Sequence, residues 1–517
     1  MLLSSLMSSS KIEYTLSGAS RYQSGYHPLA VDIGEIFLDS RKVARRGLYI
    51  ALDGIHTDSH LCLSEAEAHG AMAAVVSERA VLDGRVEPCR HNIPLICVKD
   101  CREAMARLFA AWYQNPQEKM TFIGVTGTNG KTTVTRMIYE ILSRSGERCG
   151  LIGTAGNLIS SCDDGSLELD IKPQNPLANM TTPDPEELYK ILAKMHEAGV
   201  RYVVMEVTSH ALALSKVAPI DFKIGVFTNL TEDHLDFHES MEEYYRAKRG
   251  LFLHCESAVI NIDDRYGRRL SEEIDAQRYT VSCDGRCADF AACDIRCHGE
   301  CGMEYRLASG RMRLRIKTRI PGAITVMNTL EAAAVCNLLG ISPREIKDSI
   351  FSLTGIRGRL ERLKLQNKVG FSVYIDYAHT PDALENLLRT AKMLLKKGQR
   401  IVLVFGCGGE RERQKRAMMG RVASSMADFF VITSDNPRGE DPRDIISDII
   451  SGVGDDGHFT VIEDREKAIE YVIKGARAGD IILLAGKGHE EYSIDKNGRH
   501  DFSERELVDR FVKRYYG

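Results

Sequence analysis

A glycine-rich turn near residue 130 has the composition of a phosphate-binding loop. It follows the apolar run TFIGVT, precedes a helical pattern, and contains Gly127, Thr128, Asn129, Gly130, Lys131, Thr132 and Thr133. Backbone N–H groups at such a turn can hold phosphate, the Lys131 ammonium can neutralise it, and the Thr132 hydroxyl can reach Mg²⁺. The general phosphate-loop pattern has Gly where this chain has Val125. We therefore expect a nucleoside triphosphate site of a shorter, more restricted type.

Polar side chains also stand where they could assist phosphate chemistry. Glu206 ends the apolar run YVVME, and a carboxylate at a strand end could bind Mg²⁺. His234 lies in TNLTEDHLDFH, and Lys248 lies in the helical segment MEEYYRAKRGLF. Taken alone, each has a common alternative: a solvated carboxylate, a structural histidine and an exposed lysine.

The elements that must position these residues fall into three parts. Residues 1–118 resemble a small α/β unit, and Asn115-Pro116 suits a boundary because the pair breaks a helical stretch. In residues 119–354, apolar strands alternate with turns and helices, except for a β-rich stretch at about 283–318. Residues 355–517 form a second strand and helix series. We predict an α/β protein with an N-terminal domain, a central P-loop ATPase-type parallel sheet and a C-terminal Rossmann-like domain.

Polar or glycine-rich turns follow the predicted strands of the last part. The strands are expected at residues 372–375, 401–405, 429–433 and 481–484, and the turns read DYAHTPDAL, GCGGERE, SDNPRGEDP and AGKGHEE. Ligands of open α/β sheets bind outside the carboxyl ends of the strands. These turns should therefore line one edge of a single site.

Composition excludes several functional classes. The 517 residues carry a formal net charge of -4 with both signs mixed, which offers no basic surface for nucleic acid. The first residues lack the basic flank and apolar length of a signal peptide, and no stretch approaches about 18 uninterrupted apolar residues. We expect a cytoplasmic protein without a membrane span.

A cysteine cluster leaves two interpretations open. Of the 14 cysteines, Cys283, Cys287, Cys293, Cys297 and Cys301 lie close together, with His298 among them. Their CxxxC spacing lies within the loose range for zinc ligands, and reduced cytosolic thiols are the alternative.

Motifs spread along the chain resemble those of the Mur ligases. GTNGKTT, MEVTSHAL, TNLTEDHLD, YRAKRGLF, DYAHTPDAL and SDNPRGEDP occur in this order, and the resemblance extends from about Leu38 to about Phe502. It implies an ATP-dependent amide ligase of peptidoglycan synthesis. In this family, ATP phosphorylates the carboxylate of a UDP-linked muramoyl peptide to an acyl phosphate, which an incoming amine attacks. We also expect a monomer.

The resemblance implies roles for the residues around ATP. Thr132 and Glu206 would serve one Mg²⁺, while His234 and a carbamylated Lys248 would serve a second, so that catalysis depends on these residues together with Lys131. Arg359 in GIRGRLERL would reach the γ-phosphate.

Adenosine contacts are also implied by the resemblance. Asn328 would contact adenine, and Asp376 would contact ribose with His379 close by. The family's FNxxN run reads ITVMN in this chain, so Thr325 replaces its first Asn.

Contacts to the UDP-linked substrate are implied at Ser40 and Arg41 near the uridine. Thr181, Thr182 and Ser209 would contact the sugar-peptide portion. Lys216 stands where the family usually has Arg, which keeps the charge but loses the two-pronged geometry.

Selection of the amino acid is assigned to the DNPR turn: Asp435, Asn436, Pro437 and Arg438. Arg438 could hold the second carboxylate of meso-diaminopimelate through two parallel hydrogen bonds, and lysine lacks that carboxylate. The resemblance implies that Arg411 adds a second basic contact and that Gly486 and Glu490 receive the distal amine.

Alternative functions remain open from sequence alone. One is a lysine-adding Mur ligase, and another is a ligase like folylpolyglutamate synthetase, which shares the short phosphate loop. A nucleotide-driven switch or motor is a third alternative, although it would not need Lys248, His234 and the C-terminal turns together.

Overall fold

The computed structural model describes residues 1–17, 27–54, 58–160, 169–170, 180–310, 312–365, 369–455 and 457–517. They form two compact units, which we describe separately. Unit 1 comprises residues 1–124 and 148–223, and unit 2 comprises residues 125–147 and 224–517. The predicted domain boundaries after residues 118 and 354 stay predictions.

Unit 1 begins with a 5-stranded sheet of order β1-β5-β4-β3-β2. Its strands are β1 (Thr15–Ser17), β2 (Glu35–Phe37), β3 (Gly47–Ile50), β4 (Ala71–Ser77) and β5 (Leu95–Val98). Strands β2 to β5 pair in parallel, and β1 pairs antiparallel with β5. The helices of this part are α1 (Leu3–Ser10), α2 (Leu63–His69), α3 (Glu78–Leu82) and α4 (Cys101–Trp112). The run AMAAVVS of β4 is almost wholly buried, as expected for a strand inside a covered parallel sheet.

The second sheet has 11 strands in the order β16-β15-β14-β13-β12-β11-β6-β10-β7-β8-β9. The strands are β6 (Thr121–Thr126), β7 (Cys149–Gly153), β8 (Gly156–Ile159), β9 (Leu169–Asp170), β10 (Tyr202–Glu206), β11 (Phe222–Phe227), β12 (Cys255–Asn261), β13 (Gln277–Ser282), β14 (Phe290–Cys297), β15 (Met303–Ser309) and β16 (Met312–Thr318). Both β6 and β11 contain residues of the two units.

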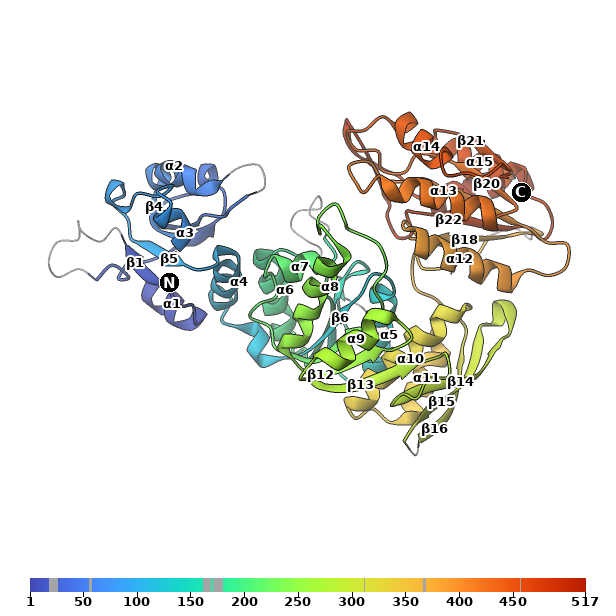
Figure 1. The fold of residues 1–517 in the computed structure, drawn as a ribbon, viewed down its shortest axis with the longest axis horizontal. Coiled ribbons are helices and arrows are strands. Elements are labelled where there is room, and N and C mark those ends of the chain that lie inside the picture. The colour runs from blue at the N-terminus through green and yellow to red at the C-terminus, as the bar shows by residue number, and fades with distance from the viewer. Residues whose placement is uncertain are drawn as a thin grey trace. The chain divides into compact units, whose positions relative to one another are not determined.

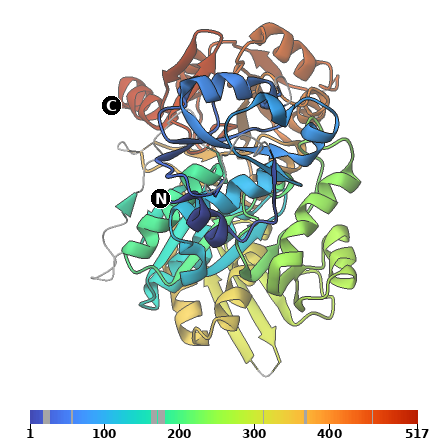
Figure 2. The ribbon, with the colours of Figure 1, turned by 90° about the vertical axis from the view of Figure 1, so that its left-hand side faces the viewer.

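Helices accompany this sheet along the chain. They are α5 (Lys131–Arg144), α6 (Pro185–Glu197), α7 (Ser209–Ala213), α8 (Met241–Arg249), α9 (Arg265–Glu273), α10 (Ala323–Leu338) and α11 (Pro343–Ser352). The β-rich stretch predicted near residues 283–318 corresponds to β14, β15 and β16. These strands pair antiparallel and continue the same sheet, where β15 and β16 form the yellow hairpin in Figure 2.

The last sheet has 6 strands in the order β17-β18-β22-β19-β20-β21. Its strands are β17 (Glu361–Arg362), β18 (Ser372–Asp376), β19 (Ile401–Phe405), β20 (Phe429–Ile432), β21 (Phe459–Val461) and β22 (Ile481–Ala485). All neighbours pair in parallel except β17 and β18. A separate hairpin joins β23 (Tyr492–Asp495) to β24 (Gly498–Asp501).

Helices cover both faces of this parallel sheet (Figure 1). Leu403 of β19 packs with α12 (Pro381–Leu394), α13 (Gln414–Met426) and α14 (Pro442–Ile450). Its neighbours Val402 and Val404 point to the other face, where they pack with α15 (Arg465–Lys474) and α16 (Glu504–Tyr516). This doubly wound arrangement confirms the predicted α/β class. Among the described residues, we find no helix with the length and apolar character needed to cross a bilayer.

Candidate functional site

The phosphate loop connects β6 to α5. At two of its positions the backbone adopts a conformation that favours glycine. Gly127 and Gly130 have φ angles of 148° and 88°. A Cβ on Gly127 would lie 1.9 Å from the Thr228 hydroxyl, so this backbone segment packs without room for a side chain. The Lys131 ammonium donates to the carbonyls of Gly127 and Thr128 at 2.9 and 2.8 Å. It therefore folds back over the loop that would hold phosphate.

Lys248 of α8 lies beside this loop. Its side chain is 1% exposed, and its Nζ donates to the Gly127 carbonyl at 2.6 Å. Burial, reinforced by the charge of Lys131, lowers the pKa of Lys248 well below the usual value for lysine. A neutral amine is the form that can react with carbon dioxide. The usual interpretation of a helix lysine as an exposed residue does not describe Lys248.

Basic groups surround Asp233 at the end of β11. His234, which has a φ angle of 57°, places its Nε2 3.3 Å from one Asp233 oxygen, and the Lys415 Nζ lies 4.0 Å from the other. Burial acts to raise the pKa of Asp233, but the positive charges around it, beginning with His234, outweigh burial and lower that pKa. Asp233 therefore stays ionised and can share a cation with His234.

Glu206 belongs to a threonine-rich group within unit 1. Its carboxylate accepts from the Thr154 backbone N–H at 2.8 Å, and its carbonyl accepts from the Thr182 hydroxyl at 2.8 Å. Thr154 and Thr181 share a hydrogen bond of 3.0 Å. The Ser209 hydroxyl at the start of α7 is buried and has no partner among the described side chains and backbone groups. An orphaned hydroxyl of this kind fits a ligand-binding site.

The other residues predicted to contact the UDP-linked substrate already have partners. Lys216 forms an ion pair of 2.7 Å with Asp184. Arg41 forms a two-pronged pair with Asp39, and Ser40 donates to Glu65. Within the described chain, no hydrogen bond or ion pair joins Ser40 or Arg41 to the Thr181 group.

A cavity in unit 2 begins at the phosphate loop. Its lining consists of Asn129, Gly130, Thr133, Ile320, Pro321, Ile324, Thr325, Asn328, Ile356, Arg359, Leu360, Asp376, Ala383, Asn386, Leu387 and Thr390. Apolar walls with a few amide and carboxylate groups suit a purine nucleoside. Thr325, in the first turn of α10, donates its hydroxyl to the carbonyl of Pro321, which precedes the helix, at 2.9 Å. Thr325 thus replaces the family's Asn with a locally satisfied hydroxyl.

Arg359 enters the same cavity from the segment before β17. Its guanidinium donates to the Thr132 hydroxyl at 2.9 Å, while its buried Nε has no partner among the described groups. Asp376 accepts the backbone N–H groups of Leu360 and Ala378 at 2.6 and 2.7 Å. A half-buried guanidinium beside a phosphate loop, with its Nε unpaired, fits a nucleoside triphosphate.

The turns after β19, β20 and β22 form a second group of predicted site residues. Arg438 and Arg411 both lie against Gly408, where a Cβ would be 3.0 Å from Arg438 Nη1 and 3.8 Å from Arg411 Cγ. Burial, reinforced by the charge of Arg411, lowers the pKa of Arg438. Arg438 donates to the Gly409 carbonyl at 2.8 Å and has a φ angle of 53°. The same turns bring Asp435 and Glu490 to 3.3 and 4.0 Å from the Lys487 ammonium. Burial, reinforced by the charge of Asp435, raises the pKa of Glu490. This group presents paired positive charges and paired carboxylates.

Gly486 and Pro437 shape the backbone around these charges. A Cβ on Gly486 would lie 2.5 Å from an Asp435 oxygen, and the position has a φ angle of 115°. The Pro437 carbonyl would lie 1.9 Å from a Cβ on Gly409. Glycine is therefore required where the turns approach each other.

Three basic residues in or next to these turns were not predicted from the sequence: Lys415 and Arg416 at the start of α13, and Lys487 after β22. Lys415 faces Asp233, and the fully buried Arg416 holds both oxygens of Glu440 at 2.9 Å. Lys487 contacts several groups of the DNPR turn. No local pattern distinguishes these lysines and arginines from exposed ones, because their burial depends on distant segments.

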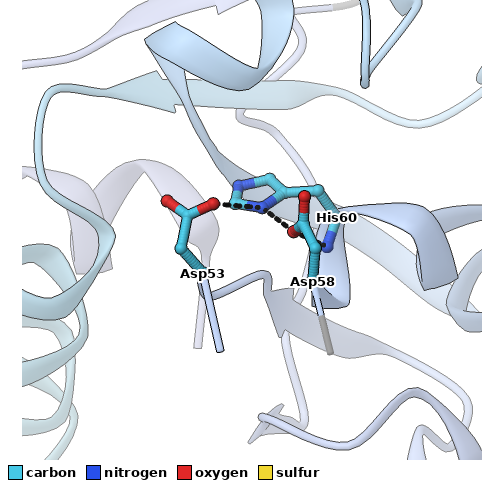
Figure 3. Close-up of side chains that lie close together, drawn as sticks. All are labelled: Asp53, Asp58 and His60. Atoms are coloured by element: carbon cyan, nitrogen blue, oxygen red, sulfur yellow. Dashed lines mark hydrogen bonds and ion pairs between the residues drawn. The ribbon is translucent and has the colours of Figure 1, made fainter. Parts of the chain in front are cut away.

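One group of potential metal ligands occurs outside these sites, among the residues that the structure describes: Asp53, Asp58 and His60 (Figure 3). The His60 Nε2 accepts the Ser77 backbone N–H at 3.0 Å, so Nδ1 carries the proton and donates to Asp58 at 2.7 Å. Arg85 pairs with both carboxylates. The group is thus satisfied without a metal ion.

The cysteine cluster does not converge on one point. Its thiols and His298 do not come together as a set of possible metal ligands in the described chain. Cys293 accepts a hydrogen bond from Arg306, and His298 lies 3.4 Å from Glu304.

Comparisons with known proteins match almost the whole chain. The model of the Mur ligase middle domain matches residues 125–336, and that of the Mur ligase glutamate ligase domain matches residues 358–488. The UDP-N-acetylmuramoyl-L-alanyl-D-glutamate--2,6-diaminopimelate ligase of Clostridium tetani is 38% identical over 98% of both chains. The enzyme of the same name from Clostridioides difficile is 40% identical over 94% of this chain and 96% of the relative.

Solved structures give a consistent result. A structure of UDP-N-acetylmuramoyl-L-alanyl-D-glutamate--2,6-diaminopimelate ligase aligns with a TM-score of 0.64 and 29% identity, covering 97% of this chain and 99% of the other. Folylpolyglutamate synthase of Mycobacterium tuberculosis shares the fold at 19% identity and a TM-score of 0.60, covering 74% of this chain and 92% of the other. The relatives of the same length are 38–40% identical to this chain, and both family models match it. Together with the glycine-rich loop and the buried lysine beside it, these matches show that this chain belongs to the Mur ligase family.

Proposed function

We propose that the protein is an ATP-dependent amide ligase that joins meso-2,6-diaminopimelate to UDP-N-acetylmuramoyl-L-alanyl-D-glutamate in peptidoglycan synthesis. The names of its relatives include both substrates. The observation that carries the proposal is the arrangement of the C-terminal turns, where Arg411 and Arg438 both lie against Gly408, and Asp435 and Glu490 both lie within 4.0 Å of the Lys487 ammonium. A molecule with carboxylates and ammonium groups at both ends complements these charges.

The chemistry begins with two anions that must approach each other. An oxygen of the substrate carboxylate attacks the γ-phosphorus of ATP, the bond to the β-phosphate oxygen breaks, and ADP leaves. Lys131 and Arg359 would offset the negative charge that gathers around the transferred phosphoryl group. The amine of diaminopimelate then attacks the acyl phosphate, loses a proton and displaces inorganic phosphate.

Mg²⁺ would shield the phosphates and orient the reacting oxygens. We assign Thr132 to one ion, and His234 with carbamylated Lys248 to the other. Glu206, which the motif resemblance also assigns to Mg²⁺, belongs to unit 1. The burial of Lys248 supports the carbamate, because a buried amine with a lowered pKa is nucleophilic at neutral pH, and its carbamate is an oxygen ligand.

Selectivity for diaminopimelate over lysine follows from the Arg pair. If lysine occupied the turns, the two guanidinium groups would remain close together without a carboxylate between them. A site built for a charged group rejects an analogue that lacks it, because the site's own buried groups are left unpaired. Arg438 thus counts against a lysine-adding ligase.

We further propose that the protein acts as a monomer in the cytoplasm. No disulfide links the described cysteines, which is typical of proteins in a reducing compartment. Light scattering after size-exclusion chromatography tests the oligomeric state, since a dimer mass would contradict it.

The function is tested by measuring phosphate release from ATP with purified protein and Mg²⁺. We expect release only when UDP-linked dipeptide and diaminopimelate are both present. The same assay is run with three amino acids as the substrate to be added: meso-diaminopimelate, LL-diaminopimelate and L-lysine. Each substrate is omitted in turn as a control. Release without acceptors would indicate a switch or motor, and preference for L-lysine would contradict the assignment of the amino acid.

A further inference from the structure

Lys487 is buried at the meeting point of two turns. It follows β22, is 1% exposed, and its Nζ donates to the Asn436 side-chain oxygen at 3.0 Å and to the Tyr492 carbonyl at 2.9 Å. The same ammonium lies 3.3 Å from an Asp435 oxygen and 4.0 Å from a Glu490 oxygen. One side chain thus contacts the DNPR turn, the AGKGHEE turn and β23.

These contacts determine the orientation of the Asn436 amide. Its oxygen also accepts the Ile494 backbone N–H at 3.0 Å, so both acceptor positions of this oxygen are used by Lys487 and Ile494. The amide nitrogen must therefore face the other way, and it donates to Glu490 at 2.9 Å. The Arg438 backbone N–H donates to the Ile494 carbonyl at 3.1 Å, which ties the selecting arginine to the same unit.

Charge compensation gives Lys487 a second effect. Asp435 and Glu490 both lie near this ammonium, and burial together with the negative charge of Asp435 raises the pKa of Glu490. Burial acts to raise the pKa of Asp435, but the charges of Lys487 and Arg465 outweigh it and lower that pKa. A buried carboxylate pair of this kind needs a cation between its members.

We propose that Lys487 is a positioning residue of the amino-acid pocket: its ammonium holds Asn436, Glu490 and the Arg438 turn in the arrangement that accepts a diamino dicarboxylic acid. This inference rests on the proposed function. Lys487 acts through these neighbours, and it is distinct from the residues that we assign to direct ligand contacts.

The test replaces Lys487 by Met, which preserves the length of the side chain and removes its hydrogen bonds and charge. The matched control is Arg400→Met. Arg400 forms a two-pronged pair of 2.8 and 2.9 Å with the buried Asp480, at the opposite end of β22. Both changes remove a cation from beside a buried carboxylate, but only Lys487 contacts the turns.

Steady-state kinetics separate positioning from general damage. Lys487→Met should raise the KM for meso-diaminopimelate by at least about 10-fold, while the KM for ATP changes less than about 2-fold. Arg400→Met should leave the KM for both substrates near the wild-type values, whatever its effect on stability. Equal KM changes for both substrates in Lys487→Met, or no change, would overturn the proposal.

Hydrogen exchange provides a readout that does not depend on activity. Lys487→Met should accelerate exchange at the amides of Arg438 and Ile494, and Arg400→Met should not. Unchanged exchange at both amides would refute the positioning role even if the kinetics shifted. If the wild-type protein did not use diaminopimelate, the proposed function would fail, while the exchange data would still decide whether Lys487 orders the turns.

Discussion

Arg359 donates a hydrogen bond of 2.9 Å to the Thr132 hydroxyl, although 227 positions separate the two residues. The contact brings a guanidinium from the segment before β17 to the first turn of α5. The Arg359 guanidinium also lies over the Tyr377 ring, with its central carbon 4.7 Å from the ring centroid. The phosphate site of unit 2 therefore combines a local loop with a cation from far along the chain.

Arg359→Ala should lower kcat by about 100- to 1000-fold, because the transferred phosphoryl group would lose a preorganised donor in a buried site. The matched control is Arg357→Ala, since the Arg357 side chain is 57% exposed and pairs with Glu491 at the surface. Phosphate release under saturating substrates measures the effect. A loss of equal size in both variants would contradict a specific role for Arg359.

Arg438→Ala should raise the KM for meso-diaminopimelate by on the order of 10- to 100-fold, because the ligand carboxylate would lose a charged pair. The KM for ATP should stay near its original value. Arg443→Ala serves as the control, because the Arg443 side chain is 82% exposed and pairs with Glu463. If the KM for ATP rose as much as that for the amino acid, Arg438 would not be the selecting residue.

Lys248→Ala should lower activity by more than about 100-fold, since an oxygen ligand for Mg²⁺ would be missing. Formate or acetate should restore part of the activity by supplying a carboxylate in the vacated space. The exposed Arg246 of the same helix, changed to Ala, provides a control that should need no rescue. Full activity of Lys248→Ala without added carboxylate would show that no carbamate is required.

Stability should fall as the pH drops below about 6.5, partly because of His379. Burial lowers the pKa of His379 from 6.5 to about 4 in the folded protein, so between these values the unfolded chain binds more protons. The folded state therefore loses on the order of 2 kcal/mol from this residue between pH 7 and pH 5.

Urea unfolding at pH 7 and pH 5 tests this contribution. The loss of unfolding free energy between the two pH values should be smaller in His379→Gln than in the wild type. His500→Gln is the control, because the His500 side chain is 51% exposed. If His379→Gln lost as much stability as the wild type on acidification, other groups would account for the pH dependence.

Features carried by contiguous residues could be predicted from the sequence. The phosphate loop is local, because Gly127, Gly130, Lys131 and Thr132 stand together after a strand and before a helix. The α/β class also followed from alternating strands and helices, and the motif order indicated the Mur ligase family. The α/β class and the family are confirmed, while phosphate binding by this loop stays a prediction. The β-rich stretch near residues 283–318 was recognised, but its continuity with the large sheet through the β13–β14 pairing was not, because hydrophobic patterns do not show which strands pair.

The individual site assignments stay predictions, and their environments came only from tertiary structure. Lysine in a helix is usually exposed, and nothing in the local sequence marks Lys248 as different. Its amine is buried only because α8 packs against the Gly127 segment. Arg411 and Arg438 come from separate turns, so their mutual repulsion could not be inferred from spacing.

The sequence by itself determined the fold class, the family and the glycine-rich turn between a strand and a helix, because those depend on short-range patterns and on the order of motifs. Tertiary structure alone decided which charges are buried and which face each other. Lys487 illustrates the difference: its glycine neighbours predict a turn, whereas its contacts with Asn436 and Tyr492 exist only because parallel strands bring their carboxyl ends to one edge of a sheet.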